Sequence, residues 1–380
     1  MRKTVLVFLD LHMGFSREIL RGLSHFLHTA PDWELKLLSY TCDMNPAFLE
    51  VHPALALVAP LSQAASNRVF LERSRQLFPG HVLGVSTLDP FMPVPRILSD
   101  SRQAGRLAAE YFLQKGYRHF GYVPDGLNPT HWGSTLRESG FRERLKQAGH
   151  SVEVMPLGDL HATRSKRKFP LALFCFNDLT ARQAISLLHA SGTAIPEEVA
   201  VLGVDNDPLE SALSPVPVSS VITDWFHVGV MAGRYLTHKT KEQLFVKQSI
   251  HWVPCLGVQT RSSTDALVSE DPVLQKTMRI ITSQISELRT VNDCAAAVGA
   301  SRRSLEMKVK NLTGHTVYEL MSLSRLQLAK QLLQYPEIPI SEVAERAGYA
   351  DSRMLGLAFR RHENETPGQF RRRARPTERP

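Results

Sequence analysis

The chain has 380 residues, 43% of them hydrophobic and 22% charged, with a formal net charge of +8. This length exceeds one ordinary domain, so two or three domains with hydrophobic cores are expected. The apolar run at residues 5–9 is too short for a signal peptide and no segment has the length of a membrane span, which argues against secretion and membrane insertion and predicts a cytoplasmic protein.

Short apolar strands alternate with amphipathic helices through the first two-thirds of the chain. The predicted strands are 4–9, 35–39, 55–59, 82–85, 119–123, 171–176 and 199–204, and the predicted helices are 16–28, 102–115, 140–148 and 179–190. This alternation is typical of α/β units around parallel sheets. The segment is longer than one such sheet usually needs, so a two-lobed α/β domain is predicted over residues 1–265. The basic stretch 161–170 is predicted to be a solvated loop.

After a polar run at residues 260–265, the sequence predicts only helices. The first covers residues 273–285, and Pro272 suits its first turn. A long amphipathic helix is predicted at 316–334, ended by Pro336 and Pro339, and would be a rod about 28 Å long. An all-α domain is therefore expected over residues 270–374, with a tail at 375–380.

The same pattern stands on both sides of that long helix. Residues 291–301 and 340–351 each predict a short helix, a turn at Gly299 or Gly348 and a capping residue, and an Arg-rich helix follows. This is the helix-turn-helix layout, whose second helix enters the major groove of DNA. Residues 270–380 also hold 18 Lys and Arg against 13 Asp and Glu, which suits a polyanion. The rod could hold two such helices at adjacent grooves, about 34 Å apart, so a bipartite double-stranded operator is predicted.

Helical spacing predicts which side chains of the two second helices face DNA. The predicted inward faces are Leu305, Val309 and Leu312 in the first helix and Leu355, Ala358 and Phe359 in the second, with Ser301 and Asp351 as the caps. The predicted DNA-binding residues are Ser301, Arg302, Arg303, Glu306, Met307, Ser352, Arg353, Gly356 and Arg360. Arginine can pair with guanine or phosphate, and Glu can accept from cytosine. For any single arginine, a solvated surface position is the alternative.

The two DNA-facing helices, the second helix of each helix-turn-helix unit, are predicted to contribute unequally to base recognition. Gly356 and Leu357 give the second helix no polar group at two outward positions, so the first helix should supply most of the base specificity.

Residues 271–373 resemble the AraC/XylS-type DNA-binding domain in the stretches SLSRLQLAKQLL, ISEVAERAGYAD, AFRR and TPGQFRR. The resemblance implies bipartite operator binding and, usually, activation of nearby promoters, with RNA polymerase as a partner. The chain departs from the family pattern at Val309, where Phe is usual, and at Asn364, where Gly is usual. Asn also tolerates a left-handed backbone, so the turn at Asn364 is expected to form.

The first two-thirds resemble the LacI/GalR-type sugar-sensing domain, itself similar to periplasmic sugar-binding proteins, in RESGFRERLKQAG, FNDLTARQAI and IPEEVAVLGVDND. XylR-like regulators join such a sensor to a C-terminal AraC-type domain. The chain resembles that group nearly end to end, including FSREILRGLSHFL, HWGSTLRESGF and LGVDNDPLESALSPVPVSSV. The resemblance implies that xylose or a related monosaccharide binds between the lobes and that the sugar-bound form activates.

Carried onto this sequence, the resemblance implies a polyol pocket. Arg137, Asn177 and Asp205 match polar pocket positions and can each give or take two hydrogen bonds, while aromatic rings would pack on the C–H faces. The predicted ligand-binding residues are Phe15, Arg17, Asp100, Trp132, Arg137, Asn177 and Asp205.

For most of these positions a purely structural role is the alternative. Arg137 could form an interlobe ion pair, Asp100 could cap a helix and Asp205 could cap a loop. Phe15 and Trp132 could be core residues. Thr223 stands where sugar sensors often have Gln, so this wall of the pocket is expected to differ.

The α/β segment carries no phosphate-binding Gly-rich motif, no HExxH, no nucleophile elbow and no metal-ligand spacing, including around Cys42, Cys175, Cys255 and Cys294. No enzyme activity, cofactor or metal is therefore predicted. The predicted function is a sugar-controlled, DNA-binding transcription activator that works as a homodimer and without a membrane. The alternatives are a constitutive DNA-binding protein whose α/β domain only dimerises, and a sugar-metabolism enzyme fused to a DNA-binding domain.

Overall fold

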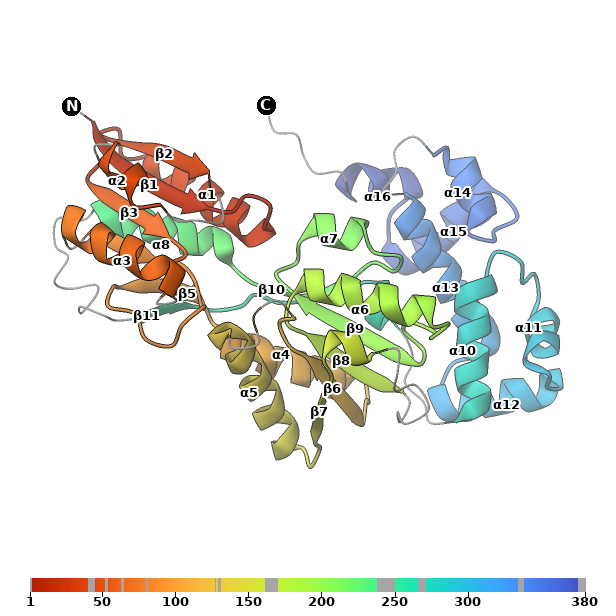
Figure 1. Cartoon of the computed structure of the whole chain (residues 1–380). Helices are drawn as coiled ribbons and strands as arrows, with labels where there is room; N and C mark the ends of the chain where they lie inside the picture. Colours follow the sequence, from red (N-terminus) through yellow and green to blue (C-terminus); the bar gives the residue numbers. More distant parts are fainter. Residues whose placement is uncertain are drawn as a thin grey trace. The chain divides into compact units, whose positions relative to one another are not determined.

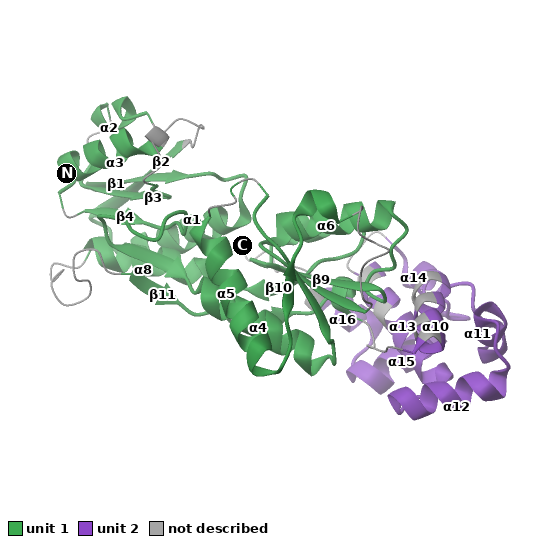
Figure 2. Cartoon of the chain, turned by 60° about the horizontal axis from the view of Figure 1, so that its bottom comes forward, with its two compact units in different colours: residues 1–265 green, residues 266–380 purple. Residues whose placement is uncertain are grey.

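The computed structural model describes residues 2–39, 45–51, 54–62, 65–79, 81–126, 128, 131–160, 170–237, 250–265, 271–333 and 338–374. Its contacts divide the chain into two compact units, Met1–Asp265 and Ala266–Pro380 (Figure 2). The basic loop predicted at 161–170, apart from Pro170, the tail at 375–380, Cys42 and Pro336 lie outside the described residues. None of the described helices is long and apolar enough to cross a membrane.

Unit 1 has two lobes, each built on a six-stranded sheet (Figure 1). In spatial order the first sheet is β11 (Ile250–Val253), β5 (Arg96–Ser99), β4 (Val82–Gly84), β3 (Ala56–Ala59), β1 (Lys3–Leu9) and β2 (Trp33–Ser39). The second is β12 (Gly257–Gln259), β10 (Ser219–Ile222), β9 (Val199–Val204), β8 (Leu171–Cys175), β6 (His119–Val123) and β7 (Val152–Val154). All neighbours pair in parallel except β10 and β12. The chain passes between the sheets after β5, β10 and β11.

Helices cover both faces of each sheet, which explains why the strands are apolar on both sides. On the first sheet, α1 (Gly14–Leu27) and α8 (Trp225–Thr237) pack on one face, and α2 (Ala47–Glu50) and α3 (Ala65–Leu77) pack on the other. On the second sheet, α6 (Asp178–Ala190) covers one face, and α4 (Ser101–Gln114) and α5 (Trp132–Gln147) cover the other. The short helix α7 (Pro208–Ala212) follows β9. Single 3-10 turns occur at Leu157–Asp159 and Ser262–Thr264.

The described part of unit 2, residues 271–333 and 338–374, is all helical. Its helices are α10 (Pro272–Gln284), α11 (Val291–Val298), α12 (Arg302–Thr313), α13 (Val317–Leu332), α14 (Ile340–Arg346), α15 (Ser352–Glu363) and α16 (Pro367–Ala374). Pro272 occupies the first turn of α10, and Asn364 ends α15 in the left-handed conformation with φ 58°. Both predictions about these residues are confirmed.

The predicted architecture, a two-lobed α/β domain followed by an all-α domain, is confirmed, but two helix boundaries were wrong. The helix predicted at 140–148 begins at Trp132, since packing against α4 overrides the weak helix propensity of its Gly and Ser residues. The helix predicted at 316–334 is α13, which has 16 residues and ends at Leu332.

Candidate functional site

Arg137 and Asp205 form the centre of a polar cluster in the second lobe. Arg137 Nη2 lies 3.5 Å from Asp205 Oδ1, and Arg137 Nη1 donates to the carbonyl of Phe176. The guanidinium also lies 4.7 Å from the centre of the Phe176 ring. Asp205 Oδ1 further accepts from Trp225 Nε1 at 3.0 Å and from the Thr223 hydroxyl at 3.4 Å. Both charged side chains are thus held in fixed positions at the carboxyl ends of β8 and β9, where open α/β sheets bind ligands.

The close packing of α5 on α4 fixes Arg137. A Cβ on Gly140 would overlap the carbonyl of Arg102, and one on Gly105 would overlap the carbonyl of Arg137 itself. Arg137 is 4% exposed, and its Nε has no hydrogen-bond partner among the described residues. A buried donor without a partner is costly. Arg137 itself does not line the small pocket described below, so its contact with a ligand stays a prediction.

The backbone after β9 adopts an uncommon conformation. Asp205 has φ 104° and Asn206 has φ 56°, both in a region that side chains other than glycine rarely adopt. Strain of this kind persists where the surrounding structure holds it, often at binding sites. Here the turn carries Asp205 toward Arg137 and brings Asp207 to the start of α7.

A small pocket opens between the β1–α1 loop of the first lobe and the ends of β8 and β9 in the second lobe. Its cavity volume is only about 20 Å³, well below the range for small-molecule sites, and it is partly open to solvent. Its lining residues are His12, Met13, Gly14, Phe15, Asn177, Asp178, Leu179, Asp205, Asp207 and Glu210. Three predicted ligand residues, Phe15, Asn177 and Asp205, therefore meet in one place.

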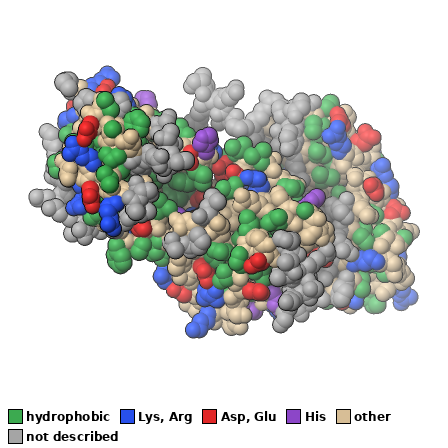
Figure 3. Space-filling view, in the orientation of Figure 1, with side chains coloured by type: hydrophobic (Ala, Val, Ile, Leu, Met, Phe, Trp, Pro, Cys, Tyr) green, Lys and Arg blue, Asp and Glu red, His purple; other side chains and the backbone are tan. Residues whose placement is uncertain are grey.

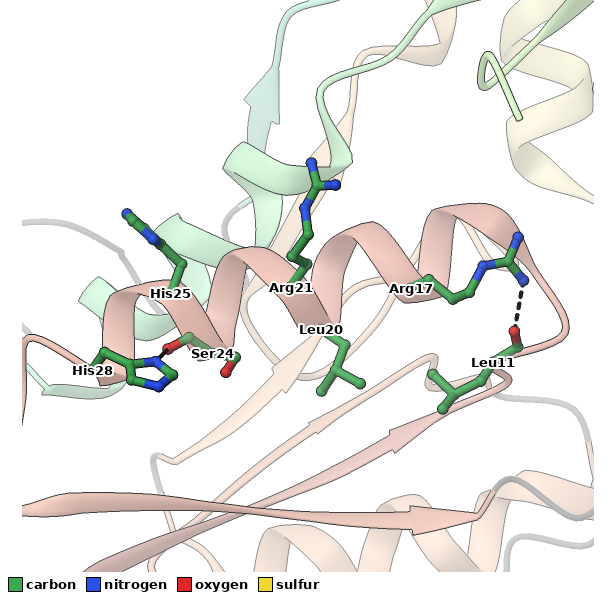
Figure 4. Close-up of a pocket in the computed structure, with 7 residues that line it drawn as sticks. All are labelled: Leu11, Arg17, Leu20, Arg21, Ser24, His25 and His28. Carbon is green, nitrogen blue, oxygen red and sulfur yellow. Dashed lines mark hydrogen bonds between the residues drawn. The ribbon is translucent and has the colours of Figure 1, made fainter. Parts of the chain in front are cut away.

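Arg17 connects the two lobes beside this pocket. Its Nη1 donates to the carbonyls of Leu11, at 2.7 Å, and His12, while Nη2 lies 3.3 Å from Asp207 Oδ2. Figure 4 shows Arg17 on α1 with its guanidinium turned toward Leu11. A Cβ on Gly14 would overlap the Asp207 carboxylate. The lobes are thus in contact in this structure, and a side chain at position 14 would have to displace the Asp207 carboxylate.

The other predicted ligand residues have structural partners. Asp100 accepts from the Gln103 amide and caps α4, which is the alternative left open for it. Trp132 packs on Trp252 at 5.7 Å and under the Arg96 guanidinium, outside the pocket lining. Phe15 packs on Trp225, at 5.3 Å, as well as lining the pocket. Their ligand contacts stay predictions.

Two further alternatives can be compared with the contacts. Arg137 forms an ion pair, but its partner Asp205 belongs to the same lobe, so the pair does not join the lobes. Asp205 uses its carboxylate for side-chain donors, and Asn177 caps α6 through Thr180 N.

Sequence reasoning missed several residues of this site, among them Gly14, Asp178, Asp207 and Trp225. The DND sequence at 205–207 was a usable signal for Asp207, which lies two positions after Asp205. Asp178 accepts from the Ser220 hydroxyl at 2.6 Å and the Asp207 amide at 2.7 Å, and its burial raises its pKa well above the ordinary range. It therefore holds the Asp207 turn in place.

His131 completes the surroundings of Arg137. Burial and the nearby Arg137 guanidinium lower the pKa of His131 to about 4, so its imidazole is neutral at pH 7. Its Nδ1 accepts from Ser134 N and caps α5, and its ring lies 4.9 Å from that of Phe176. Among the described residues, no group of three His, Cys, Asp or Glu could hold a metal ion.

Gly14→Ala tests whether the contact between the lobes matters for ligand binding. The added Cβ must displace the Asp207 carboxylate, which breaks its pair with Arg17 and its cap on α7. We expect ligand affinity to fall at least about tenfold, which is about 1.4 kcal/mol. Each lobe keeps its own core, so the Tm of the free protein should change little. The matched control is Gly158→Ala, since a Cβ there meets open space; equal affinities for the two variants would contradict the expectation.

In unit 2 the two helix-turn-helix units repeat one geometry. Ser301 accepts from Ser304 N and caps α12, and Asp351 accepts from Met354 N and caps α15. Residues 301–310 and 351–360 have the same order of buried and exposed positions. Leu305, Val309, Leu355 and Phe359 are fully buried, and Ala358 is half-buried. The inward prediction for Leu312 was wrong, because this residue is 51% exposed near the end of α12.

The predicted DNA-binding residues lie on the opposite faces of α12 and α15. Arg302, Arg303, Met307, Ser352, Arg353 and Arg360 are exposed, as are the caps, and Glu306 and Gly356 are half-buried. Arg302 Nε lies 3.1 Å from Glu306 Oε1, so these two groups are paired in the free protein. On α15, Leu357 and Met354 are exposed beside Arg353. Basic and acidic side chains are intermixed on the face of the molecule in Figure 3.

Comparisons with known proteins agree with this two-part organisation. Residues 109–264 match the periplasmic binding protein-like domain, and residues 294–373 match the helix-turn-helix domain. A xylose operon regulatory protein of Haemophilus influenzae is 26% identical over 290 residues, which are 73% of this chain and 74% of that protein. The counterpart of Escherichia coli K12 is 25% identical over 74% of this chain and 75% of its own length.

Solved structures show the same folds. A structure described as the xylose-binding transcription activator xylR superposes with a TM-score of 0.80 over 98% of both chains, at 20% identity. A LacI family regulator of Enterococcus faecium with bound ribose superposes with a TM-score of 0.56, at 18% identity, over 70% of this chain and 100% of its own.

Proposed function

We propose that this chain, a XylR-like DNA-binding transcription regulator with a sugar-binding-like domain, is switched by a neutral monosaccharide bound between the lobes of unit 1. The observation that carries the proposal is the meeting of Phe15, Asn177 and Asp205 in one interlobe pocket. Asp205 is in turn paired with Arg137, whose buried Nε has no hydrogen-bond partner in the part of the chain that the structure describes. Xylose is the first candidate ligand because the relatives regulate a xylose operon or bind xylose by name.

The charges around the pocket favour an uncharged sugar over a phosphorylated one. Asp205, Asp207 and Glu210 all line it. The arginines at its edge are engaged: Arg17 with Asp207, Arg137 with Asp205, and Arg182 with Glu210 at 2.6 Å. A phosphate dianion would meet carboxylates and would have to displace these pairs, whereas hydroxyls can donate to the same carboxylates.

The proposed mechanism is a shift between open and closed lobes. Sugar bridges Phe15 in the first lobe and Asn177 and Asp205 in the second, so it binds the closed form more tightly and raises its population. Closure changes how the DNA-binding units of a homodimer are presented to a bipartite operator, and the sugar-bound form activates transcription with RNA polymerase. The homodimer, the polymerase contact and activation rest on the resemblance to XylR-like regulators.

A thermal-shift screen of the full chain tests the proposal. All four tryptophans, Trp33, Trp132, Trp225 and Trp252, lie in unit 1, so intrinsic fluorescence follows that unit alone. A neutral pentose or hexose at about 100 times its Kd should stabilise unit 1 by about 2.7 kcal/mol, and its phosphate should have less effect. The Asp205→Ala chain should lose the shift. A flat response to all neutral sugars would contradict the proposal and favour a domain that only dimerises.

A further inference from the structure

The two helix-turn-helix units of unit 2 have separate hydrophobic cores. One is formed by α10, α11, α12 and the start of α13, where Leu320 and Met321 are buried. The other is formed by α14, α15 and the end of α13, where Leu326 and Ala329 are buried. Half-buried Leu328 packs against both. Because neither core reaches far into the other, contacts across the junction must determine how the two recognition helices are oriented.

Arg325 lies on α13 where the two cores adjoin. Its Nη2 donates to the carbonyl of Leu288 at 2.8 Å and also lies 3.5 Å from the carbonyl of Arg289. These carbonyls belong to the loop between α10 and α11 in the first helix-turn-helix unit. A guanidinium suits this position since its several N–H groups are fixed in one plane and can engage more than one acceptor.

The turn of the second helix-turn-helix unit also lies close to Arg325. Gly348 has φ 82°, and a Cβ there would lie 2.8 Å from the carbonyl of Ile285 and 3.2 Å from Arg325 Nε. The next residue, Tyr349, packs on the second core. Its hydroxyl and Arg325 Nε are both buried without a hydrogen-bond partner among the described residues. Arg325 therefore contacts the loop of one unit and faces the turn of the other.

We propose that Arg325 is a positioning residue that holds the two helix-turn-helix units at one spacing and orientation, so that α12 and α15 meet the two half-sites of one operator in register. This inference rests on the proposed bipartite DNA binding. It goes beyond that function because it assigns the coupling between the two helix-turn-helix units to a residue that does not itself touch DNA. If α13 alone set the spacing of these units, Arg325 would be dispensable for the spacing preference.

The test measures spacing preference rather than affinity alone. The full-length wild-type chain first selects a duplex from a random-sequence pool. Affinity is then measured for that duplex, for each half-site alone, and for duplexes with one or two base pairs inserted between the half-sites. Joining two DNA-binding units in one chain increases the affinity only where the geometry lets both units bind their half-sites at once. The wild type should therefore lose at least about tenfold on insertion.

Arg325→Met should lose at least about tenfold on the selected duplex, and its insertion penalty should shrink to less than about threefold, with half-site affinities nearly unchanged. Arg325→Lys should be intermediate, because one ammonium cannot reproduce the planar set of donors. The matched control is Lys330→Met on the same helix. Lys330 pairs with Glu363 inside the second unit, at 2.6 Å, so its loss should weaken binding equally at every spacing.

An unchanged insertion penalty in Arg325→Met would overturn the inference. If the Met variant does not fold, an unchanged insertion penalty in Arg325→Lys would overturn it instead. A wild-type chain that selects no two-part duplex would overturn the bipartite function and this inference with it. A two-part duplex whose spacing preference survives in both Arg325 variants would overturn the inference alone.

Discussion

Replacing Arg137 with methionine should abolish sugar binding and destabilise unit 1 by about 3 kcal/mol, since removing one partner of a buried ion pair leaves the other charge uncompensated. Methionine keeps most of the stem volume but gives Asp205 no charged partner, and Asp205 is 12% exposed. Only the neutral Trp225 and Thr223 donors would remain on its carboxylate. Urea unfolding followed by tryptophan fluorescence gives the stability, and calorimetric titration with the sugar from the screen gives the affinity.

The matched control for this variant is Arg142→Met, five residues further along α5. Arg142 pairs with Glu138 at 2.7 Å but is 44% exposed, so its loss should cost no more than about 1 kcal/mol. Its sugar affinity should equal that of the wild type. If Arg137→Met bound the sugar as tightly as Arg142→Met, the assignment of the pocket would be wrong.

Arg303→Ala should weaken operator binding by about 10- to 100-fold, the range expected for a lost bidentate contact to a base, whereas Arg353→Ala should weaken it less. Arg303 is exposed in the first turn of α12, and recognition helices contact base edges with their N-terminal residues. Arg353 holds the equivalent place on α15, but its neighbours Gly356 and Leu357 offer no hydrogen-bonding side chain. The affinities are measured at several salt concentrations on the duplex that the wild type selects.

Salt and sequence dependence separate the two roles. Loss of a base contact should relax specificity at one position of the operator, while loss of a phosphate contact should weaken all sequences alike and reduce the salt slope by about one. We expect the first behaviour for Arg303→Ala and the second for Arg353→Ala. If Arg303→Ala kept the wild-type affinity while Arg353→Ala abolished binding, α15 and not α12 would make the larger contribution to operator recognition.

Residues that share a strand end or a helix face could be predicted from the sequence. Asn177 and Asp205 follow β8 and β9, which pair in parallel, so their side chains had to meet at one edge of the sheet. In unit 2, helical spacing and capping chemistry placed Ser301, Asp351, Leu305 and Phe359 correctly, because these depend on neighbours along one helix.

Contacts between distant segments could not be predicted in this way. Arg17 and Asp207 are 190 positions apart, and their pairing depends on how the lobes meet. Trp225 reaches Asp205 only because the chain crosses back to the first lobe directly after β10. Leu312 fitted the helical period, but the core does not extend to the end of α12.

One titration shows whether sugar in unit 1 controls DNA binding by unit 2. The full-length chain is titrated into its selected duplex with and without the sugar that stabilises unit 1 most. We predict that the sugar changes the operator Kd by at least about fivefold, within the usual range of coupling between two sites, and that Asp205→Ala removes this dependence. An operator Kd that stays the same while the sugar demonstrably binds would mean that unit 1 does not control DNA binding by unit 2.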